Sequence, residues 1–406
     1  MKLFHGGRVQ AESTRAPEAL DILVDDKGRV EALLAPGSAA PGAERIDLSN
    51  RLVVPGLLDA HQHLDKSRTL RDVPNPAGDL DGAIAAFSAH ATRMTQADVE
   101  RNAERTIAAC LERGTVAIRS HVNIDTECRL RNIEALLAVR QRWADRLRVQ
   151  VVAFLTSGGV HASEGAAWLD SALRAGADVV GATPNRAHDV GAFMDVLFAA
   201  AERHGRPIDV HLDEHLDVTH VHFDALIERT LAHGMQGRVV ASHSSVLSAL
   251  PPAEAARIIE GLARADIGVV TLPAANLFLQ GRSYDRLTPR GLTRVNDLAR
   301  AGVTVACASD NIQDPFVPTG SGDLLEIARW TLLAAHLGST ELARAFDMVT
   351  RHPAKLMGLE ADHGIKVGAR ADWLVTDALD AEDLVASGPL ARTVVFGGRL
   401  LAEPGH

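Results

Sequence analysis

The spacing of apolar residues differs between the middle of the chain and its two ends. In the middle, eight apolar runs rich in Val and Ile read LVVPGLLDAH, TVAIRSHV, RVQVVAFL, ADVVGA, PIDVHLDE, GRVVASHS, IGVVTLP and GVTVACASD. Between most of them lie longer stretches, such as 96–114 and 191–205, where apolar residues recur every three or four positions. That spacing is typical of a helix with one face packed on a sheet. Strands that are apolar throughout and alternate with helices indicate a parallel sheet buried on both faces.

Eight strand–helix units predict an α/β fold, namely a (β/α)8 TIM-type barrel over residues 55–358. A doubly wound open sheet is the alternative, but no glycine-rich phosphate-binding turn follows a strand. The ends of the chain carry short β-like pieces instead: DILVDD, RVEALLA and IDLSNRLVV near the start, and ADWLVTD, RTVVFGG and RLLAE near the end. The first two flank a Lys27-Gly28 turn, which is typical of a hairpin. We therefore expect residues 1–54 and 359–406 to pair as one small β-sandwich domain.

The composition argues against several classes of protein. The net charge of −10 and the 4% of aromatic residues disfavour nucleic-acid binding, which requires a basic face. Three scattered cysteines, Cys110, Cys128 and Cys307, are too few for a disulfide framework. The first residues lack the apolar stretch of a signal peptide, and no apolar run is long enough to span a bilayer. We expect a soluble, cytoplasmic protein that binds neither nucleic acid nor membrane.

Residues suited to metal binding follow four of the eight runs. Reactive residues of a TIM barrel lie at the carboxyl ends of its strands, and here the first, fifth, sixth and eighth runs end in HQH, HLDE, SHS and SDN. A barrel interior filled with Val and Ile has no structural need of these side chains. Imidazole and carboxylate groups suit Zn²⁺, Fe²⁺ and Mn²⁺. The fourth run ends in Thr183-Pro184-Asn185, without a lysine that could bridge a second ion, so we expect one divalent metal ion per subunit.

These motifs, in this order, resemble the amidohydrolase superfamily and, within it, the cytosine deaminase branch. The resemblance runs from VVPGLLDAHQHLDKS to GIKVGARADWLV, and its most specific part is the series HLDE, SH, SDN and DPFVPTGSGD. It implies that the metal is held by His61, His63, His211 and Asp310. It also implies catalytic roles for Glu214 as the proton shuttle and for His243 as the residue that orients the attacking water. Asp310 would serve a second time, as a hydrogen-bond acceptor for that water.

Three departures from the cytosine deaminase pattern bear on the substrate. Thr156 stands where a glutamine would bind the pyrimidine amide edge, Asn311 replaces a second aspartate, and Phe316 replaces a tryptophan. A site that requires paired hydrogen bonds rejects analogues strongly when a partner is missing, so cytosine itself is disfavoured. The remaining candidates for substrate contact are Lys66, His121, Gln280 and Asp314. For Lys66 a salt bridge with Asp65 at the rim is an alternative, for Gln280 the cap of a loop, and for His121 a position deep in the barrel.

The segments HLDKS and ASDNIQDPFVPTGSGD also resemble N-isopropylammelide amidohydrolase, which releases an alkylamine from a triazine but lacks a glutamate at the position of Glu214. We predict a metal-dependent hydrolytic deaminase of a small nitrogen heterocycle: activated water attacks the ring carbon that bears the amino group, and ammonia leaves. Alkylamine release from a triazine and ring opening of a cyclic amide are the alternatives. A catalytically inactive barrel that serves in binding or assembly is disfavoured because every expected ligand is present. The resemblance also implies a homo-oligomer.

Overall fold

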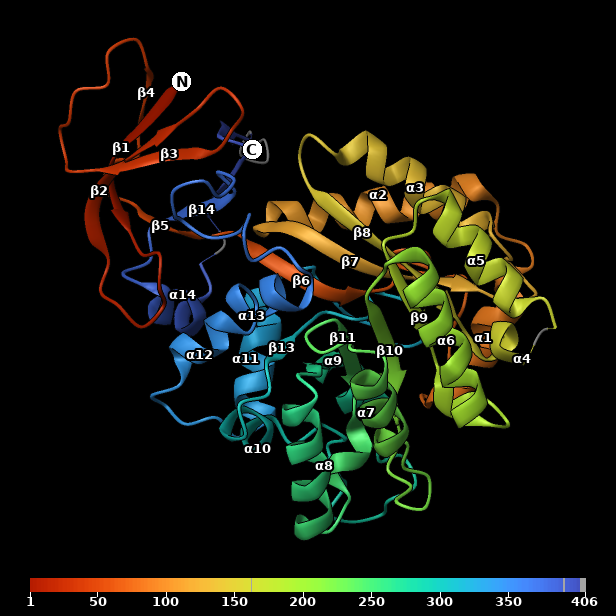
Figure 1. Cartoon of the computed structure of the whole chain (residues 1–406). Helices are drawn as coiled ribbons and strands as arrows, with labels where there is room; N and C mark the ends of the chain where they lie inside the picture. The colour runs from red at the N-terminus through yellow and green to blue at the C-terminus, as the bar shows by residue number, and fades with distance from the viewer. Residues whose placement is uncertain (162, 390, 402–406) are drawn as a thin grey trace.

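The computed structural model describes residues 1–401 except 162 and 390, and the last five residues of the predicted terminal domain lie outside the described part. Eight parallel strands form one sheet in chain order: β6 (Leu57–Gln62), β7 (Thr115–Ile124), β8 (Arg148–Leu155), β9 (Val179–Ala182), β10 (Ile208–Leu212), β11 (Val239–His243), β12 (Gly268–Thr271) and β13 (Val305–Cys307). Figure 1 shows these strands enclosed by helices. The predicted barrel is confirmed, and each of the eight apolar runs contributes one of its strands.

The barrel closes where its last strand meets its first. The backbone N–H of Asp310 donates to the carbonyl of His61 at 2.9 Å, and the N–H of His63 donates to the carbonyl of Asp310 at 3.3 Å. A parallel bridge joins Gln62 to Asp310 at the same point. The first and last predicted metal-binding motifs are therefore tied together by the backbone itself.

Helices follow most of the strands and bury apolar faces against the sheet. Their bounds are α1 (Leu80–Ala91), α2 (Gln96–Glu112), α3 (Arg131–Trp143), α4 (Ser157–His161), α5 (Gly165–Ala175), α6 (Val190–His204), α7 (Phe223–Ala232), α8 (Pro252–Arg264), α9 (Pro273–Leu279), α10 (Val295–Arg300), α11 (Leu324–Ala334), α12 (Leu342–Asp347), α13 (Arg351–Leu356) and α14 (Ala381–Ser387). Short 3-10 turns occupy η1 (Pro184–Arg186) and η2 (Ser245–Ser248). In α2, a capping box between Thr95 and Asp98 fixes the first turn. Among the described residues, no helix is long and apolar enough to cross a membrane.

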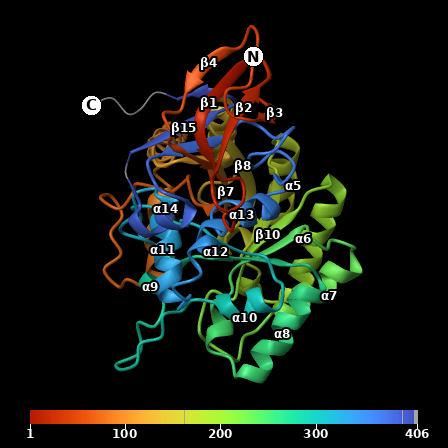
Figure 2. The ribbon, with the colours of Figure 1, turned by 90° about the vertical axis from the view of Figure 1, so that its left-hand side faces the viewer.

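The two ends of the chain share a second, mixed sheet, as expected. Its strands are β1 (Lys2–Val9), β2 (Glu18–Val24), β3 (Val30–Leu34), β4 (Glu44–Asp47), β5 (Leu52–Pro55), β14 (Trp373–Thr376), β15 (Arg392–Phe396) and β16 (Arg399–Leu400). β14 from the C-terminal part pairs antiparallel with β5 from the N-terminal part. The predicted hairpin is confirmed as β2 and β3. Figures 1 and 2 show this sheet beside the barrel, with the red and dark-blue ends of the chain together.

One predicted run is divided between the two sheets. LVV belongs both to the predicted terminal piece IDLSNRLVV and to the predicted barrel run LVVPGLLDAH. In the structure it forms β5 of the terminal sheet, and the second part of the run forms β6 of the barrel. The break falls at Gly56, where a Cβ atom would come within 2.6 Å of Val116. Only glycine allows this close approach, so the chain can cross from one sheet to the other there.

The terminal sheet has a small apolar core of its own, in which Phe4 packs edge-on against Trp373 with ring centroids 5.3 Å apart. Helix α14 lies in the same C-terminal segment, yet Ala381, Leu384 and Val385 join the apolar core of the barrel. The domain boundaries at 54/55 and 358/359 therefore remain a prediction.

Candidate metal centre and active site

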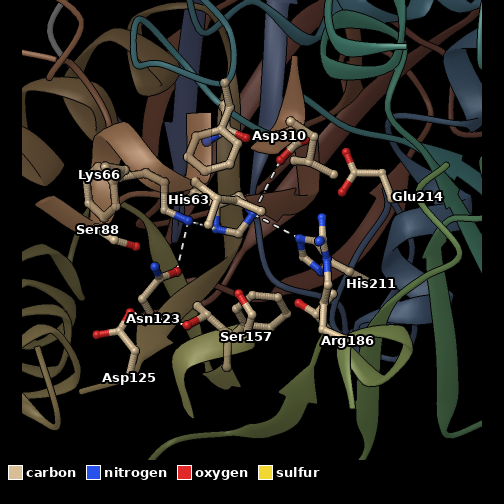
Figure 3. Close-up of a pocket in the computed structure, with 18 of the residues that line it drawn as sticks. His63, Lys66, Ser88, Asn123, Asp125, Ser157, Arg186, His211, Glu214 and Asp310 are labelled. Atoms are coloured by element: carbon tan, nitrogen blue, oxygen red, sulfur yellow. Dashed lines mark hydrogen bonds and ion pairs between the residues drawn. The ribbon is translucent and has the colours of Figure 1, made fainter. Parts of the chain in front are cut away.

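Five side chains from four strand ends converge at one end of the barrel. His61 and His63 come from the end of β6, His211 from β10, His243 from β11, and Asp310 follows β13. The Nε2 atoms of His63 and His211 lie 3.1 Å apart. Asp310 Oδ1 lies 3.6 Å from His61 Nε2 and 3.4 Å from His63 Nε2. Figure 3 shows His63, His211 and Asp310 directed toward a common point.

Left-handed backbone conformations accompany the ends of these strands. Asp213, His243 and Asp310 have φ angles of 49°, 66° and 59°. Residues other than glycine adopt such angles at a cost, and they cluster at sites where the surrounding structure holds them in place. Here they turn the backbone off each strand, and His243, Asp310 and the residue after Asp213, Glu214, line the cavity.

Several nitrogen and oxygen atoms that could bind a metal ion at this point have no hydrogen-bond partner among the described residues. His61 Nε2, His243 Nε2 and Asp310 Oδ1 are buried without a hydrogen bond. Burial lowers the pKa of His61, His63 and His211 well below the usual value, so their imidazoles are neutral at pH 7 and can offer lone pairs. Burial, together with the carboxylate of Glu214, raises the pKa of Asp310. A set of neutral imidazoles around a carboxylate that lacks a counter-charge fits a divalent metal ion.

Glu214 lies beside this cluster on the loop after β10. Its Oε1 atom is 3.3 Å from His243 Nδ1, and its side chain is only 9% exposed. Burial raises the pKa of Glu214 to about 8, although the charges of Arg186 and Lys66 act in the opposite direction. The backbone of the loop is fixed at two places: Gln280 Nε2 donates to the Glu214 carbonyl at 3.1 Å, and the preceding Asp213 binds His222.

A cavity opens from the cluster toward the ends of β7, β8 and β9. It is lined by His63, Lys66, Leu80, Ile84, Phe87, Ser88, Asn123, Asp125, Phe154, Thr156, Ser157, Thr183, Asn185, Arg186, His211, Glu214, His243, Asp310, Asn311 and Phe316. Four of the predicted substrate residues are among them: Lys66, Thr156, Asn311 and Phe316. The alternative of a rim salt bridge for Lys66 is wrong, because this side chain is buried and its Nζ donates to Asn123 Oδ1 at 2.9 Å.

Three predicted substrate residues do not line this cavity: His121 and Asp314 are buried beside it, and Gln280 lines a neighbouring hollow. His121 is fully buried, and its ring stacks on that of His61 at 3.8 Å. Asp314 accepts a 2.6 Å hydrogen bond from Asn311 Nδ2 and two more from the backbone N–H groups of Phe316 and Val317. Gln280 braces the backbone of Glu214. Gln280 and Asp314 thus each contact a residue that lines the cavity, whereas His121 packs on His61.

Comparisons with known proteins agree with this geometry. The family model described as "Amidohydrolase family" matches residues 96–402. The pterin deaminase of Rhizobium rhizogenes (strain K84 / ATCC BAA-868) is 32% identical over 94% of this chain and 87% of its own. The chain belongs to the amidohydrolase family.

Two further relatives of this amidohydrolase are close over nearly their full lengths. The N-isopropylammelide isopropyl amidohydrolase of Pseudomonas sp. (strain ADP) is 27% identical over 89% of this chain and 88% of that protein. The crystal structure of 5-methylcytosine deaminase from Klebsiella pneumoniae, liganded with 5-fluorocytosine, has 30% sequence identity. It superposes with a TM-score of 0.92 and covers 100% of this chain and 98% of that one. The resemblance to cytosine deaminase-like amidohydrolases is thus confirmed.

Sequence reasoning missed several polar residues that line the cavity of this amidohydrolase, among them Asn123, Asp125 and Arg186. Asn123 and Asp125 lie at the end of β7, and Arg186 lies in the turn after β9. The rule that polar strand ends face the site would have found them. The residue types that suit a metal ion stand out at strand ends, whereas Asn, Arg and a single Asp are common in any loop.

Proposed function

We propose that this protein is a metal-dependent hydrolase that removes the amino group of a nitrogen heterocycle as ammonia. The observation that carries the proposal is the placement of the Glu214 carboxyl beside the convergent group of three histidines and Asp310. Support comes from the relatives, which include a pterin deaminase, a 5-methylcytosine deaminase and an N-isopropylammelide isopropyl amidohydrolase.

In this proposal one divalent ion, Zn²⁺ or Fe²⁺ with Mn²⁺ as a further choice, is held by His61, His63, His211 and Asp310. Bound there, such an ion supplies Lewis acidity that lowers the pKa of water to about 7. The nitrogen and oxygen donors match the preferences of these ions. No lysine ends β9, where Thr183 precedes the turn η1, which supports a single ion.

Glu214 carries the protons of the reaction. Attack of water on a ring carbon builds negative charge on the adjacent ring nitrogen, and the departing amino group must also be protonated. A carboxyl group with a pKa raised to about 8 changes its charge close to neutral pH, so it can accept the proton of the water and return it. Glu214 delivers this proton to the ring nitrogen, then takes the remaining proton of the added hydroxyl and gives it to the amino group. The C–N bond breaks, ammonia leaves and the ring carbon becomes a carbonyl carbon.

His243 orients the attacking water in this scheme. Burial and the charge of His121 lower the pKa of His243 to about 3, so the ring is neutral and keeps one N–H donor at pH 7. Its Nδ1 faces Glu214 at 3.3 Å, and its Nε2 faces Asp310 Oδ2 at 4.0 Å. The ring thus lies between the proton carrier and the metal ligand, where a water molecule has to be aligned.

The wall opposite the metal centre favours a substrate other than cytosine. The Thr156 hydroxyl donates to Asp125 Oδ2 at 3.3 Å, which orients its oxygen as an acceptor and leaves no paired donor and acceptor of the kind an amide provides. The ring of Phe316 packs 5.1 Å from the Lys66 ammonium. We propose an aminated pyrimidine, triazine, pterin or related ring as the substrate, with Lys66, Thr156, Asn311 and Phe316 in contact with it.

Release of an alkylamine from a triazine is the second candidate. The 27% identity to N-isopropylammelide isopropyl amidohydrolase over 89% of this chain favours it. The chemistry at the ring carbon is the same, and only the leaving amine differs. Product analysis therefore decides between the two candidates.

The test is turnover of a panel of aminated heterocycles by metal-analysed protein, with ammonia assays and product mass spectra. Glu214→Gln should lower kcat by about 10²–10⁴-fold on the ring that is turned over, while the metal content stays unchanged. Asp217→Asn is the matched control, because this acid lies on the same loop with its side chain 55% exposed. Full activity of Glu214→Gln, or wild-type protein that takes up no metal, would contradict the proposal.

A further inference from the structure

A chain of buried polar side chains runs from the barrel interior to His61. Arg119 on β7, Asp209 on β10 and Ser242 on β11 are each at most 1% exposed. Arg119 Nη1 donates to Asp209 Oδ2 at 2.8 Å, Ser242 Oγ donates to Asp209 Oδ1 at 2.9 Å, and His61 Nδ1 lies 2.9 Å from Ser242 Oγ. Fully buried charges are rare unless they are paired, because desolvation is costly.

The direction of each hydrogen bond follows from which of these groups carries a proton that it can donate. Asp209 Oδ2 accepts from the Arg119 guanidinium at 2.8 Å in an ion pair whose side chains are at most 1% exposed, so the carboxylate only accepts. Ser242 has a single hydroxyl proton, and the bond to Asp209 uses it. The Ser242 oxygen must then accept from His61, which places the imidazole proton on Nδ1.

We infer that Asp209 and Ser242 are positioning residues that fix His61 in the Nδ1–H tautomer and thereby set the affinity of the metal site. The inference rests on the proposed function, because it takes the metal site as given. With the proton on Nδ1, the lone pair of His61 is on Nε2, which has no hydrogen-bond partner among the described residues and lies 3.6 Å from Asp310 Oδ1. A partner on the far nitrogen of a ligating histidine fixes its orientation and raises its basicity.

Two further contacts hold the same ring. His121 stacks on His61 with an interplanar angle of 26°, and His121 Nε2 lies 3.2 Å from Asp209 Oδ1. Arg119 is itself immobilised, because its Nε donates to Gln150 Oε1 and its Nη2 donates to the Leu356 carbonyl, each at 3.0 Å. Asp209 is therefore the centre of a rigid group, and its charge balances that of Arg119.

His63 provides an internal contrast. Its Nδ1 lies 3.0 Å from the carbonyl oxygen of His121 and 3.0 Å from Lys66 Nζ. Of these two groups only the carbonyl oxygen can accept a proton from the ring, and as a backbone group it cannot be removed by substitution. At His61 the same task falls to side chains. Ser242 and Asp209 thus influence the metal affinity through the tautomer of His61, and this influence can be removed by substituting either side chain.

The experiment measures Zn²⁺ affinity of the apo-protein by competition with a chromophoric chelator. Ser242→Ala should weaken Zn²⁺ binding by about 10–100-fold, and Ser242→Thr, which keeps the hydroxyl, should restore most of it. Ser245→Ala is the matched control, because Ser245 is buried nearby and its hydroxyl has no partner among the described residues. Thermal unfolding of each apo-protein shows whether the fold is intact.

A second variant tests the tautomer itself. In Asp209→Asn, the amide oxygen can still accept from Arg119, which leaves the amide nitrogen to donate to Ser242. Ser242 would then donate to His61 Nδ1 and move the imidazole proton to Nε2. We expect weaker Zn²⁺ binding than in Ser242→Ala, with a changed ¹⁵N chemical shift of His61.

The outcomes separate this inference from the proposed function. If folded Ser242→Ala binds Zn²⁺ as tightly as the wild type, or only loses thermal stability, the positioning role is overturned while the metal site stands. If Ser242→Thr binds as weakly as Ser242→Ala, the hydroxyl is not the group that matters and the role is overturned too. If the wild-type protein itself binds no Zn²⁺, Fe²⁺ or Mn²⁺, both the proposed function and this inference fail.

Discussion

The carboxyl group of Glu214 owes its raised pKa to burial more than to any neighbour. Among the residues that the structure describes, only His243 lies within ion-pair distance of it, and that ring is neutral. The cations Arg186 and Lys66 act on Glu214 from a greater distance and oppose the effect of burial. Removing one of these charges should therefore raise the pKa of Glu214 further.

This gives a prediction for the pH dependence of turnover. The first proton transfer requires ionised Glu214, so kcat/KM should rise as the pH passes through the pKa of this group. Arg186→Gln removes a charge that lowers that pKa, and the acidic limb of the kcat/KM profile should move to higher pH. Arg186→Lys keeps the charge and should leave the limb near its wild-type position. An unchanged limb in Arg186→Gln, or equal shifts in both variants, would contradict the electrostatic role.

The sequence predicted the position of single residues better than the direction of their side chains. His61, His63, His211 and Asp310 could be found because they follow apolar strands whose carboxyl ends meet on one face of a barrel. The same argument treats Asn311 and Asp314 alike, yet only Asn311 faces the cavity, while Asp314 accepts its hydrogen bond from behind. Which of two neighbouring loop residues points inward depends on turn geometry that the sequence pattern does not encode.

Among the elements of the fold, the loop between β10 and α7 bears most directly on catalysis. It begins at Asp213, whose left-handed conformation turns the chain so that Glu214 faces the cavity. The Asp213 carboxylate accepts from the backbone N–H of His222 at 2.8 Å, and Oδ1 lies 2.7 Å from the His222 ring. The start of the loop is thus tied to the residue that precedes α7.

The contact between these residues predicts a pH-dependent stability. The hydrogen bond to Asp213 raises the pKa of His222, so the protonated imidazole stabilises the folded state. This contribution is fully present below the ordinary histidine pKa of about 6.5 and disappears as the pH rises through the higher pKa of the folded state. The free energy of unfolding in urea, measured between pH 5 and 9, should fall less steeply in His222→Gln than in the wild type. Parallel curves for the two proteins would argue against a charged His222.

The number and order of the elements followed from the sequence because the apolar runs are long and rich in β-branched residues. The strand at which the chain passes from one sheet to the other followed less clearly. Residues 52–54 fit both the terminal piece IDLSNRLVV and the first barrel run, and the close approach of Gly56 to Val116 where the chain changes sheets is not visible in the sequence pattern. Sequence patterns report which faces are buried, but they do not report which partner covers them.

For the whole molecule, the question is how the terminal sheet is held on the barrel. Arg392 on β15 forms a bidentate ion pair with Asp323, the N-cap residue of α11, at 2.7 and 2.9 Å. The side chains are 0% and 7% exposed. Arg392 also donates to the carbonyls of Arg113 and Pro389, each at 2.7 Å. One guanidinium group therefore joins the terminal sheet to two segments of the barrel.

The homo-oligomer expected from the resemblance remains a prediction at this scale.

Breaking this pair should destabilise the whole protein without altering the metal centre. Arg392→Met leaves the Asp323 carboxylate buried and unpaired, which should cost about 3–5 kcal/mol in the free energy of unfolding. Asp323→Asn keeps a side chain able to cap α11, so it should cost less, and the double variant should recover part of the loss because no buried charge is left alone. Urea unfolding measures each change, and Zn²⁺ titration of the folded proteins should give equal affinities.

If Arg392→Met unfolds within about 0.5 kcal/mol of the wild type, the pair does not hold the sheet in place. If it also weakens Zn²⁺ binding, the terminal sheet supports the metal centre in a way that the contacts between Arg392, Asp323 and the barrel do not explain.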